Sequence, residues 1–175
     1  MRSRSTAVLS LTAIAVLALA GCATQPASDG AGTAEPSPTA SVAESSYASP
    51  AVAGERTGVD GTDLQLWSSV APDEGAVGTL GDPDAGNQWV TVNVAQWTAA
   101  ADQTDVDVAP VLRSTADESF TGTAVSPRAV DVPMTADKLY TFAWSFQVPE
   151  NLVDATSLVL CTSADADAAC TSIDK

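Results

Sequence analysis

The chain has 175 residues, of which 45% are hydrophobic, seven are basic and 22 are acidic. This length allows one domain of ordinary size once terminal segments are set aside. Residues 22–175 hold five basic against 22 acidic residues, which gives them a formal charge of −17. A surface of that sign repels phosphate groups, so nucleic acids are excluded as expected partners, and so is attachment to anionic lipid through charge. The scarcity of lysine beside abundant alanine and valine indicates a GC-rich, actinobacterial genome.

Residues 1–21 have the parts of a signal peptide. Arg2 and Arg4 form a short basic start, and an almost wholly apolar run of 14 residues follows at 7–20. A helix that spans a bilayer needs about 20 such residues, so the run is too short to span and is typical of a signal-peptide core. Because Ser3 separates the two arginines, they do not form a twin-arginine signal, and we expect the general secretion route.

The apolar run ends in Leu19-Ala20-Gly21-Cys22. This tetrapeptide resembles the lipobox of bacterial lipoproteins at all four positions. The resemblance implies cleavage before Cys22 and a thioether-linked diacylglyceryl group on its thiol, with acyl chains such as palmitate. Each buried methylene contributes about 0.8 kcal/mol, so two or three chains anchor a protein permanently. We therefore expect a protein held by lipid on Cys22 at the extracytoplasmic face of the cell membrane. The alternative is an ordinary secreted protein with a cysteine there by chance.

The cysteine count favours the same interpretation. Three is an odd number for an exported protein, and setting Cys22 aside leaves Cys161 and Cys170 as a pair. An oxidising compartment favours a disulfide between them, and closing a ring of about ten residues stabilises a fold by about 2–3 kcal/mol. Two free thiols are the alternative. The chain has no histidine to complete a tetrahedral metal site with these cysteines, so we predict no such site.

Residues 22–60 are rich in alanine, serine, threonine, proline and glycine. Their larger apolar residues, Val42, Tyr47 and Val52, follow no period. Such a segment buries too little apolar surface to offset the entropy lost on ordering. We therefore predict a disordered tether over 22–60, with the folded domain at 61–175.

Beyond about residue 61, apolar and polar residues alternate with a period of two. Val90, Val92 and Val94 share one face of a segment at 88–97. A second segment at 138–148 places a row of large apolar residues on one face, namely Tyr140, Phe142, Trp144, Phe146 and Val148. Both patterns predict β-strands. Shorter candidate strands lie at 64–70, 108–113, 120–125, 129–132 and 157–161.

About seven short strands, separated by turn-like clusters such as 81–87 and without a helical period, predict an antiparallel β-sandwich. We expect the two longest strands to supply much of its core. The remaining core positions are predicted at Leu112, Phe120, Val125 and Leu158.

Three segments carry a family resemblance. The strand Trp89-Val-Thr-Val-Asn-Val94 is followed, after a polar turn, by Phe146-Gln-Val-Pro-Glu150 and then by Leu158-Val-Leu160. The order resembles that of the immunoglobulin-like domains of bacterial envelope lipoproteins and of a small secreted mycobacterial immunoprotective antigen. The resemblance covers roughly residues 85–162 and implies an immunoglobulin-like fold and a place in the envelope. The chain departs from the family where Thr98-Ala-Ala-Ala-Asp-Gln-Thr104 replaces an Asn-rich turn, and no catalytic residue is implied.

The sequence offers little for catalysis. The absence of histidine excludes Ser-His-Asp and Cys-His sites. Lys138 stands beside Asp137 in a predicted turn, where we expect a solvated side chain rather than a base. Paired carboxylates hydrolyse glycosides in other proteins, but an acidic chain offers such pairs by chance, here Asp102, Asp105, Asp107, Asp117 and Glu118.

Carboxylate clusters also suit calcium, which prefers hard oxygen ligands. Three candidate groups are Asp82 with Asp84 and Asn87, Asp102 with Asp105 and Asp107, and Asp165 with Asp167. None has the glycine and glutamate spacing of an EF-hand loop, and we predict solvated loop acids rather than a metal site.

The tryptophans raise the possibility of a sugar-stacking platform. Trp89 and Trp97 share the face opposite the valines, but eight residues of strand separate them by about 26 Å, too far for one small platform. We expect loops to cover these rings, and Trp144 to lie in the core.

These observations predict a lipid-anchored, extracytoplasmic binding module, without catalysis or cofactor, whose partner is an unidentified protein or envelope component. A calcium- or small-ligand-binding lipoprotein is the first alternative, and an envelope hydrolase is the second.

Overall fold

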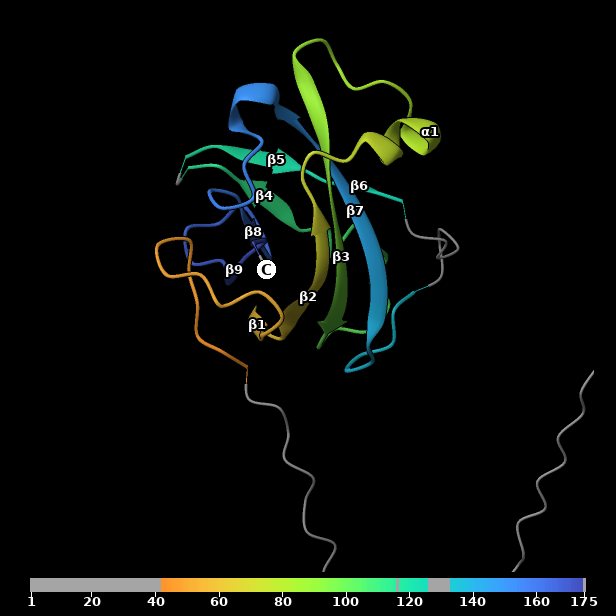
Figure 1. Ribbon diagram of the computed structural model, residues 1–175. Coiled ribbons are helices and arrows are strands. Elements are labelled where there is room, and N and C mark those ends of the chain that lie inside the picture. The colour runs from red at the N-terminus through yellow and green to blue at the C-terminus, as the bar shows by residue number, and fades with distance from the viewer. Residues whose placement is uncertain (1–41, 116, 126–132, 175) are drawn as a thin grey trace, which may run out of the picture. The chain divides into compact units, whose positions relative to one another are not determined.

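A computed structural model of the chain describes residues 42–115, 117–125 and 133–174 (Figure 1). The predictions on the signal peptide, on Cys22 and on the candidate strand at 129–132 lie outside the described residues. Among the described residues, no helix is both long and apolar enough to cross a bilayer.

Strands are the main regular structure of the described chain. They are β1 (Arg56–Val59), β2 (Thr62–Val70), β3 (Asn87–Thr98), β4 (Val111–Arg113), β5 (Ser119–Thr121), β6 (Thr123–Ala124), β7 (Tyr140–Pro149), β8 (Val159–Cys161) and β9 (Cys170–Ser172). The helical pieces are one turn each: η1 (Glu74–Ala76), α1 (Val77–Leu80) and η2 (Glu150–Leu152).

The strands form two antiparallel sheets. One sheet has the order β1-β2-β3-β7-β6, and the other has the order β5-β4-β8-β9. Without the edge strand β1, these orders are those of an immunoglobulin-like sandwich, with strands A-B-E-D in one sheet and C′-C-F-G in the other. The prediction of an all-β, immunoglobulin-like sandwich is therefore confirmed. Six of the seven expected strands fall in the described part, which holds nine, because β1 and β9 were missed and 120–125 forms two strands.

The core lies between the two sheets, as alternation predicted. Val90, Val92 and Val94 of β3 are fully buried, and β7 adds its aromatic face. The facing sheet contributes Leu112, Leu158, Leu160 and Ile173. Phe120, which we expected in the core, is only partly buried and packs against its edge.

Gly122 is where the chain passes from one sheet to the other. It separates β5, in the sheet of β4 and β8, from β6, in the sheet of β3 and β7. A Cβ at this position would lie 2.9 Å from the ring of Phe146, closer than real side-chain contacts come. Glycine lets the backbone cross directly over the aromatic core, which explains why one predicted strand is two.

The prediction that the tether extends to residue 60 is wrong, because β1 begins at Arg56 and forms a hairpin with β2. The two residues of the turn, Asp60 and Gly61, have φ values of 51° and 78°. Positive φ at both positions is typical of the type I′ turn, whose twist matches that of paired strands, and Asp-Gly is one of its preferred sequences.

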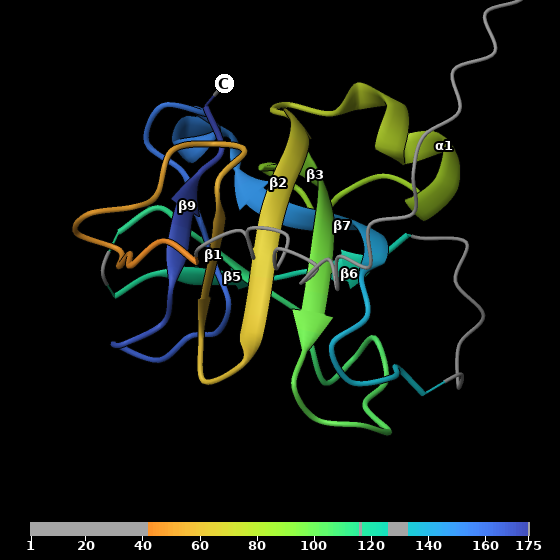
Figure 2. The ribbon, with the colours of Figure 1, turned by 90° about the horizontal axis from the view of Figure 1, so that it is seen from below.

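Residues 42–55, which we call the strap, also belong to the fold. The N–H of Ala43 donates to the carbonyl of Arg56 in β1, and the N–H of Ala51 donates to the carbonyl of Cys170 in β9, each at 2.9 Å. Figure 2 shows the strap in orange alongside β1 and β9. It hydrogen-bonds to edge strands of both sheets. Its few apolar residues did not predict this, because hydrogen bonds to sheet edges need no apolar period.

Candidate functional site

The outer face of the sheet β5-β4-β8-β9 carries a second, smaller cluster. Successive side chains of a strand point to opposite faces, so Leu160 enters the core while its neighbours Val159 and Cys161 face outward. Ala168, Cys170, Val111 and Tyr47 complete the cluster. Tyr47 comes from the strap, so this face is covered by the segment that we predicted to be disordered.

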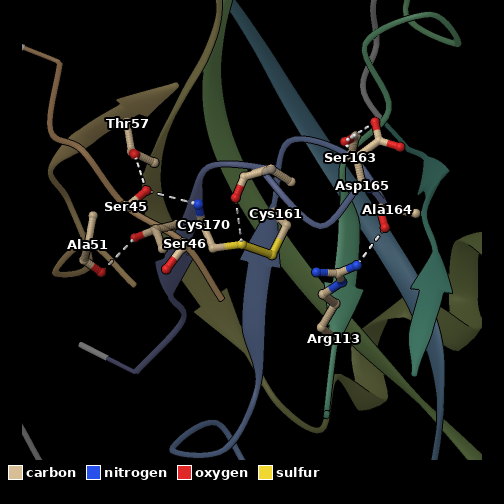
Figure 3. The surroundings of a disulfide bond; sticks show 12 residues. Ser45, Ser46, Ala51, Thr57, Arg113, Cys161, Ser163, Ala164, Asp165 and Cys170 are labelled. Atoms are coloured by element: carbon tan, nitrogen blue, oxygen red, sulfur yellow. Dashed lines mark hydrogen bonds between the residues drawn. A yellow bond between two sulfur atoms is a disulfide. The ribbon is translucent and has the colours of Figure 1, made fainter. Parts of the chain in front are cut away.

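A disulfide joins Cys161 to Cys170 at the centre of this cluster (Figure 3). The two cysteines are directly opposite each other in β8 and β9, with their Cα atoms 4.1 Å apart. Both are fully buried. The predicted pairing of these two cysteines is confirmed.

The strap is held over the disulfide by side-chain hydrogen bonds. The hydroxyl of Ser45 accepts from the N–H of Cys170 at 2.9 Å and also bonds to the hydroxyl of Thr57 (Figure 3). The Tyr47 hydroxyl donates to the carbonyl of Ser114 at 3.2 Å. These contacts link the strap to β1, to β9 and to the turn after β4.

Arg113, at the end of β4, is a buried cation on the same face. Its residue is only 6% exposed. Nη2 donates to the carbonyl of Ala164 at 2.5 Å, in the turn between β8 and β9, and the guanidinium carbon lies 5.9 Å from the centre of the Tyr47 ring. The Nε–H is buried and has no hydrogen-bond acceptor among the described residues.

A pocket of about 320 Å³ opens beside Arg113. Its walls are the strap, the turn after β4 and the turn after β8. The lining residues are Ser46, Tyr47, Ala48, Arg113, Asp117 and Ala166. The pocket therefore combines one cation, one aromatic ring, two methyl groups and one exposed carboxylate.

The acidic loops have other roles. Within the ranges 42–115, 117–125 and 133–174, no group of three Asp, Glu, Cys or His side chains is placed to hold a metal ion. Asp107 accepts from both the N–H and the hydroxyl of Thr104, and Asp165 accepts from the hydroxyl of Ser163. Asp105 is buried and accepts from the N–H of Val106. These carboxylates cap their own loops.

The other carboxylates considered for hydrolysis do not form a described pair with one another. Glu118 accepts from the hydroxyl of Ser114 at 2.5 Å. Asp102 has a φ of 63° in its loop, and Asp117 lines the pocket described above. Lys138 is exposed in a turn, as expected.

Asp154 caps the turn before β8. Its carboxylate accepts from the hydroxyl of Thr156 at 2.8 Å and from the N–H of the same residue at 3.0 Å. These hydrogen bonds, the hydroxyl first, hold the pKa of Asp154 below the usual value of an aspartate.

The loop expected over each tryptophan of β3 covers Trp89, whereas Trp97 is partly buried and packs against a side chain of β1. Trp89 is buried, and its Nε1–H donates to the carbonyl of Gly81 in the loop that follows α1. The guanidinium of Arg56 lies 4.1 Å from the centre of the Trp97 ring, and the same arginine pairs with Asp63. Trp144 is in the core.

Sequence reasoning missed Arg113 and Tyr47 as site residues. The signal for Arg113 was present, because it alternates with the core residue Leu112 in a predicted strand of an otherwise acidic protein. Tyr47 had no such signal, because its contacts are made with residues distant in the chain.

No family model and no curated protein sequence matches the chain. A solved structure that is similar is the crystal structure of an uncharacterised β-sandwich protein from Clostridium difficile 630. The two share 9% sequence identity over 71% of this chain and 95% of that one, with a TM-score of 0.42. The assignment of the fold above rests on the strand order.

Proposed function

We propose that the protein is a lipid-anchored, extracytoplasmic binding module that acts without catalysis. The argument for the lipid anchor comes from the cysteines. Cys161 and Cys170 are bonded to each other, so Cys22 has no cysteine of the same chain left to pair with. It stands at the end of the apolar run in Leu19-Ala20-Gly21-Cys22, and a disulfide is typical of exported proteins.

The binding role rests on the pocket beside Arg113. A pocket of about 320 Å³ with a cation, an aromatic ring and methyl groups has the composition of a small-ligand site. The absence of histidine from the chain excludes the common hydrolytic triads, which favours recognition over reaction. The resemblance of residues 85–162 to domains of envelope lipoproteins supports the same location.

Metabolic labelling tests the anchor. The full precursor is expressed in bacteria fed an alkyne-bearing fatty acid, and we expect the wild-type protein to carry the label and to sediment with membranes. Cys22→Ser should lose both properties. The control Cys22→Ser with Ser28→Cys keeps the number of thiols but moves one out of the tetrapeptide, and it should also be unlabelled. Label on the Cys22→Ser protein at the wild-type level would disprove the anchor.

Native mass spectrometry tests the binding role. Lipidated protein, extracted from its own membrane in mild detergent, should appear with an additional mass from a bound component. The same sample, unfolded and refolded in clean detergent, provides the control and should lose that mass. A native sample that shows only the mass of the lipidated chain would contradict the proposal.

A further inference from the structure

Arg113 differs from the other well-described arginine. Arg56 is partly exposed, stacks on Trp97 and pairs with the carboxylate of Asp63. Arg113 is more deeply buried, and no carboxylate of the described chain lies within 4.0 Å of its guanidinium. A buried charge is unfavourable unless a group of opposite sign compensates it. In a protein with so few cations, a buried arginine without an acidic partner among the described residues is a candidate site for an anionic ligand.

The donors of Arg113 show where that ligand would bind. Nη2 is fixed by the carbonyl of Ala164, which holds the guanidinium in one orientation. Nε is buried and has no acceptor in the described chain, so the hydrogen bonds found there leave the guanidinium only partly satisfied. The planar fork of a guanidinium matches the two oxygens of a carboxylate. Figure 3 shows the guanidinium on the side of the disulfide opposite the strap residues Ser45 and Ala51.

The rest of the pocket selects the ligand further. The Tyr47 ring and the methyl groups of Ala48 and Ala166 provide an apolar wall next to the guanidinium. Asp117 adds a negative charge, and the whole mature chain is strongly negative. Arg113 can neutralise a singly charged anion, whereas a phosphate would bring more charge than one arginine neutralises, and Asp117 opposes either ligand.

We propose that the pocket of Ser46, Tyr47, Ala48, Arg113, Asp117 and Ala166 binds a ligand that carries a carboxylate next to an apolar group of about the size of an aromatic ring. Arg113 binds the carboxylate, and Tyr47 packs against the apolar group. This inference rests on the proposed binding role and names its ligand class. Because Tyr47 belongs to the strap, the bound ligand also holds the strap in place.

Calorimetric titration of the lipidated, full mature chain in nanodiscs tests the proposal with benzoate as the probe. Benzamide has the same shape without the charge, and inorganic phosphate has charge without the ring. We expect benzoate to bind at least tenfold more tightly than either. Equal binding of benzoate and benzamide, or no binding of benzoate at tens of millimolar, would overturn the proposal.

Two exposed positions give a matched pair of variants that do not disturb the core. Asp117→Asn removes the negative charge of the pocket and should tighten benzoate binding several-fold. Asp82→Asn makes the same change in a distant exposed loop and should leave the affinity unchanged. An Asp117→Asn affinity equal to that of wild type would place the benzoate elsewhere and would contradict the assignment.

Arg113→Lys keeps the charge but loses the fork, and should weaken benzoate binding at least tenfold. Because this change also removes the contact with Ala164, its fold is checked by circular dichroism, and the Asp117→Asn result stands if it does not fold. A folded Arg113→Lys protein with wild-type affinity would refute the role of the fork. If benzoate does not bind but native mass spectrometry still shows a bound component, the proposed ligand class is wrong and the proposed binding role is still supported.

Discussion

Among single residues, Gln96 is notable because its polar side chain is buried in the apolar core. It continues the valine face of β3 and is only 2% exposed. Its side-chain nitrogen donates to the carbonyl of Val108, and its side-chain oxygen accepts from Nε1 of Trp144, both at 2.6 Å. Gln96 therefore satisfies two polar groups that would otherwise be buried without partners, and it ties the chain before β4 to the centre of β7.

Replacing Gln96 by leucine keeps the volume and removes both hydrogen bonds. We expect the free energy of unfolding to fall by about 2–4 kcal/mol, because each polar group left unpaired costs about 1–3 kcal/mol. Urea unfolding followed by tryptophan fluorescence measures the change. Asn93→Ala on the outer face of the same strand is the control, and because it removes only an exposed hydrogen bond to Ser68 it should cost at most about 1 kcal/mol. A Gln96→Leu protein as stable as the control would show that these bonds contribute nothing.

Asp154 gives a prediction on pH. Its pKa is lowered in the folded protein by the hydrogen bonds from Thr156, so its stabilising effect is present at neutral pH and is lost as the pH falls through the folded pKa. Carboxyl chemical shifts should place its titration below the usual value of an aspartate. Thr156→Ala should raise the pKa of Asp154 towards the usual value, and an unchanged titration would contradict the assigned cause.

At the scale of elements, the strap and the β8–β9 hairpin stabilise each other. The strap lies across edge strands of both sheets, where it occupies backbone groups that an edge strand would otherwise offer to another chain. The disulfide holds β8 to β9 beneath it. Both devices act on the weakest part of a sandwich, its edges.

Two neighbouring residues of the strap differ in burial, and together they test whether the strap is docked. Ala51 is 7% exposed, and Val52 is 68% exposed. Ala51→Asp places an unpaired charge between the strap and β9, so we expect it to lower the free energy of unfolding by about 2–4 kcal/mol. Val52→Asp should change it by less than about 0.5 kcal/mol. Equal effects at both positions would mean that the strap is not docked in solution.

Removing the disulfide by replacing Cys161 and Cys170 with alanine should reduce the free energy of unfolding by about 2–3 kcal/mol, since the closed ring of about ten residues no longer restricts the unfolded chain. Denaturant titration of the double variant measures the loss. Non-reducing mass spectrometry of the wild-type protein provides the control, and two thiols open to alkylation would show that the bond is absent.

At the scale of the whole molecule, charge sets the conditions for stability. Residues 22–175 hold 22 acidic and five basic residues, and the ion pair of Arg56 with Asp63 is the one formed among the described residues. Like charges spread over a small domain repel one another and destabilise the compact state. The same charge makes a cationic pocket rare on this surface, which is why Arg113 stands out.

Salt should therefore stabilise the protein. Raising NaCl from 10 to 200 mM shortens the range of repulsion to about 7–10 Å, and we expect the melting temperature to rise by several degrees. KCl at the same ionic strength should have an equal effect, because screening does not depend on the identity of the cation. A melting temperature that is independent of salt would contradict this account.

The sandwich could be predicted from the alternation of apolar and polar residues along single strands. The valine row of β3 and the aromatic row of β7 have the period of a strand, and the sequence could place both in the core because alternation is a property of the strand itself. The pairing of Cys161 with Cys170 also followed from the sequence, because the two cysteines are close in the chain and the third is set apart.

The site could not be predicted in the same way. Arg113 was visible as a charge in a strand, but its contact is with the ring of Tyr47, which is 66 residues away in the chain. The Asp60-Gly61 turn indicated a hairpin that includes β1, but the predicted domain boundary was placed between these two residues.

The sequence by itself determined the longer strands β2, β3 and β7, the inward faces of β3 and β7, the disulfide and the strong negative charge, since each depends on residues that are near in the chain or on a sum over the chain. Only the tertiary structure decided that residues 42–55 form a strap and that a pocket lies between it and two turns. The physical reason is that the strap is held by backbone hydrogen bonds to strand edges and by side-chain hydrogen bonds of Ser45 and Tyr47, and most of these partners are distant in the chain.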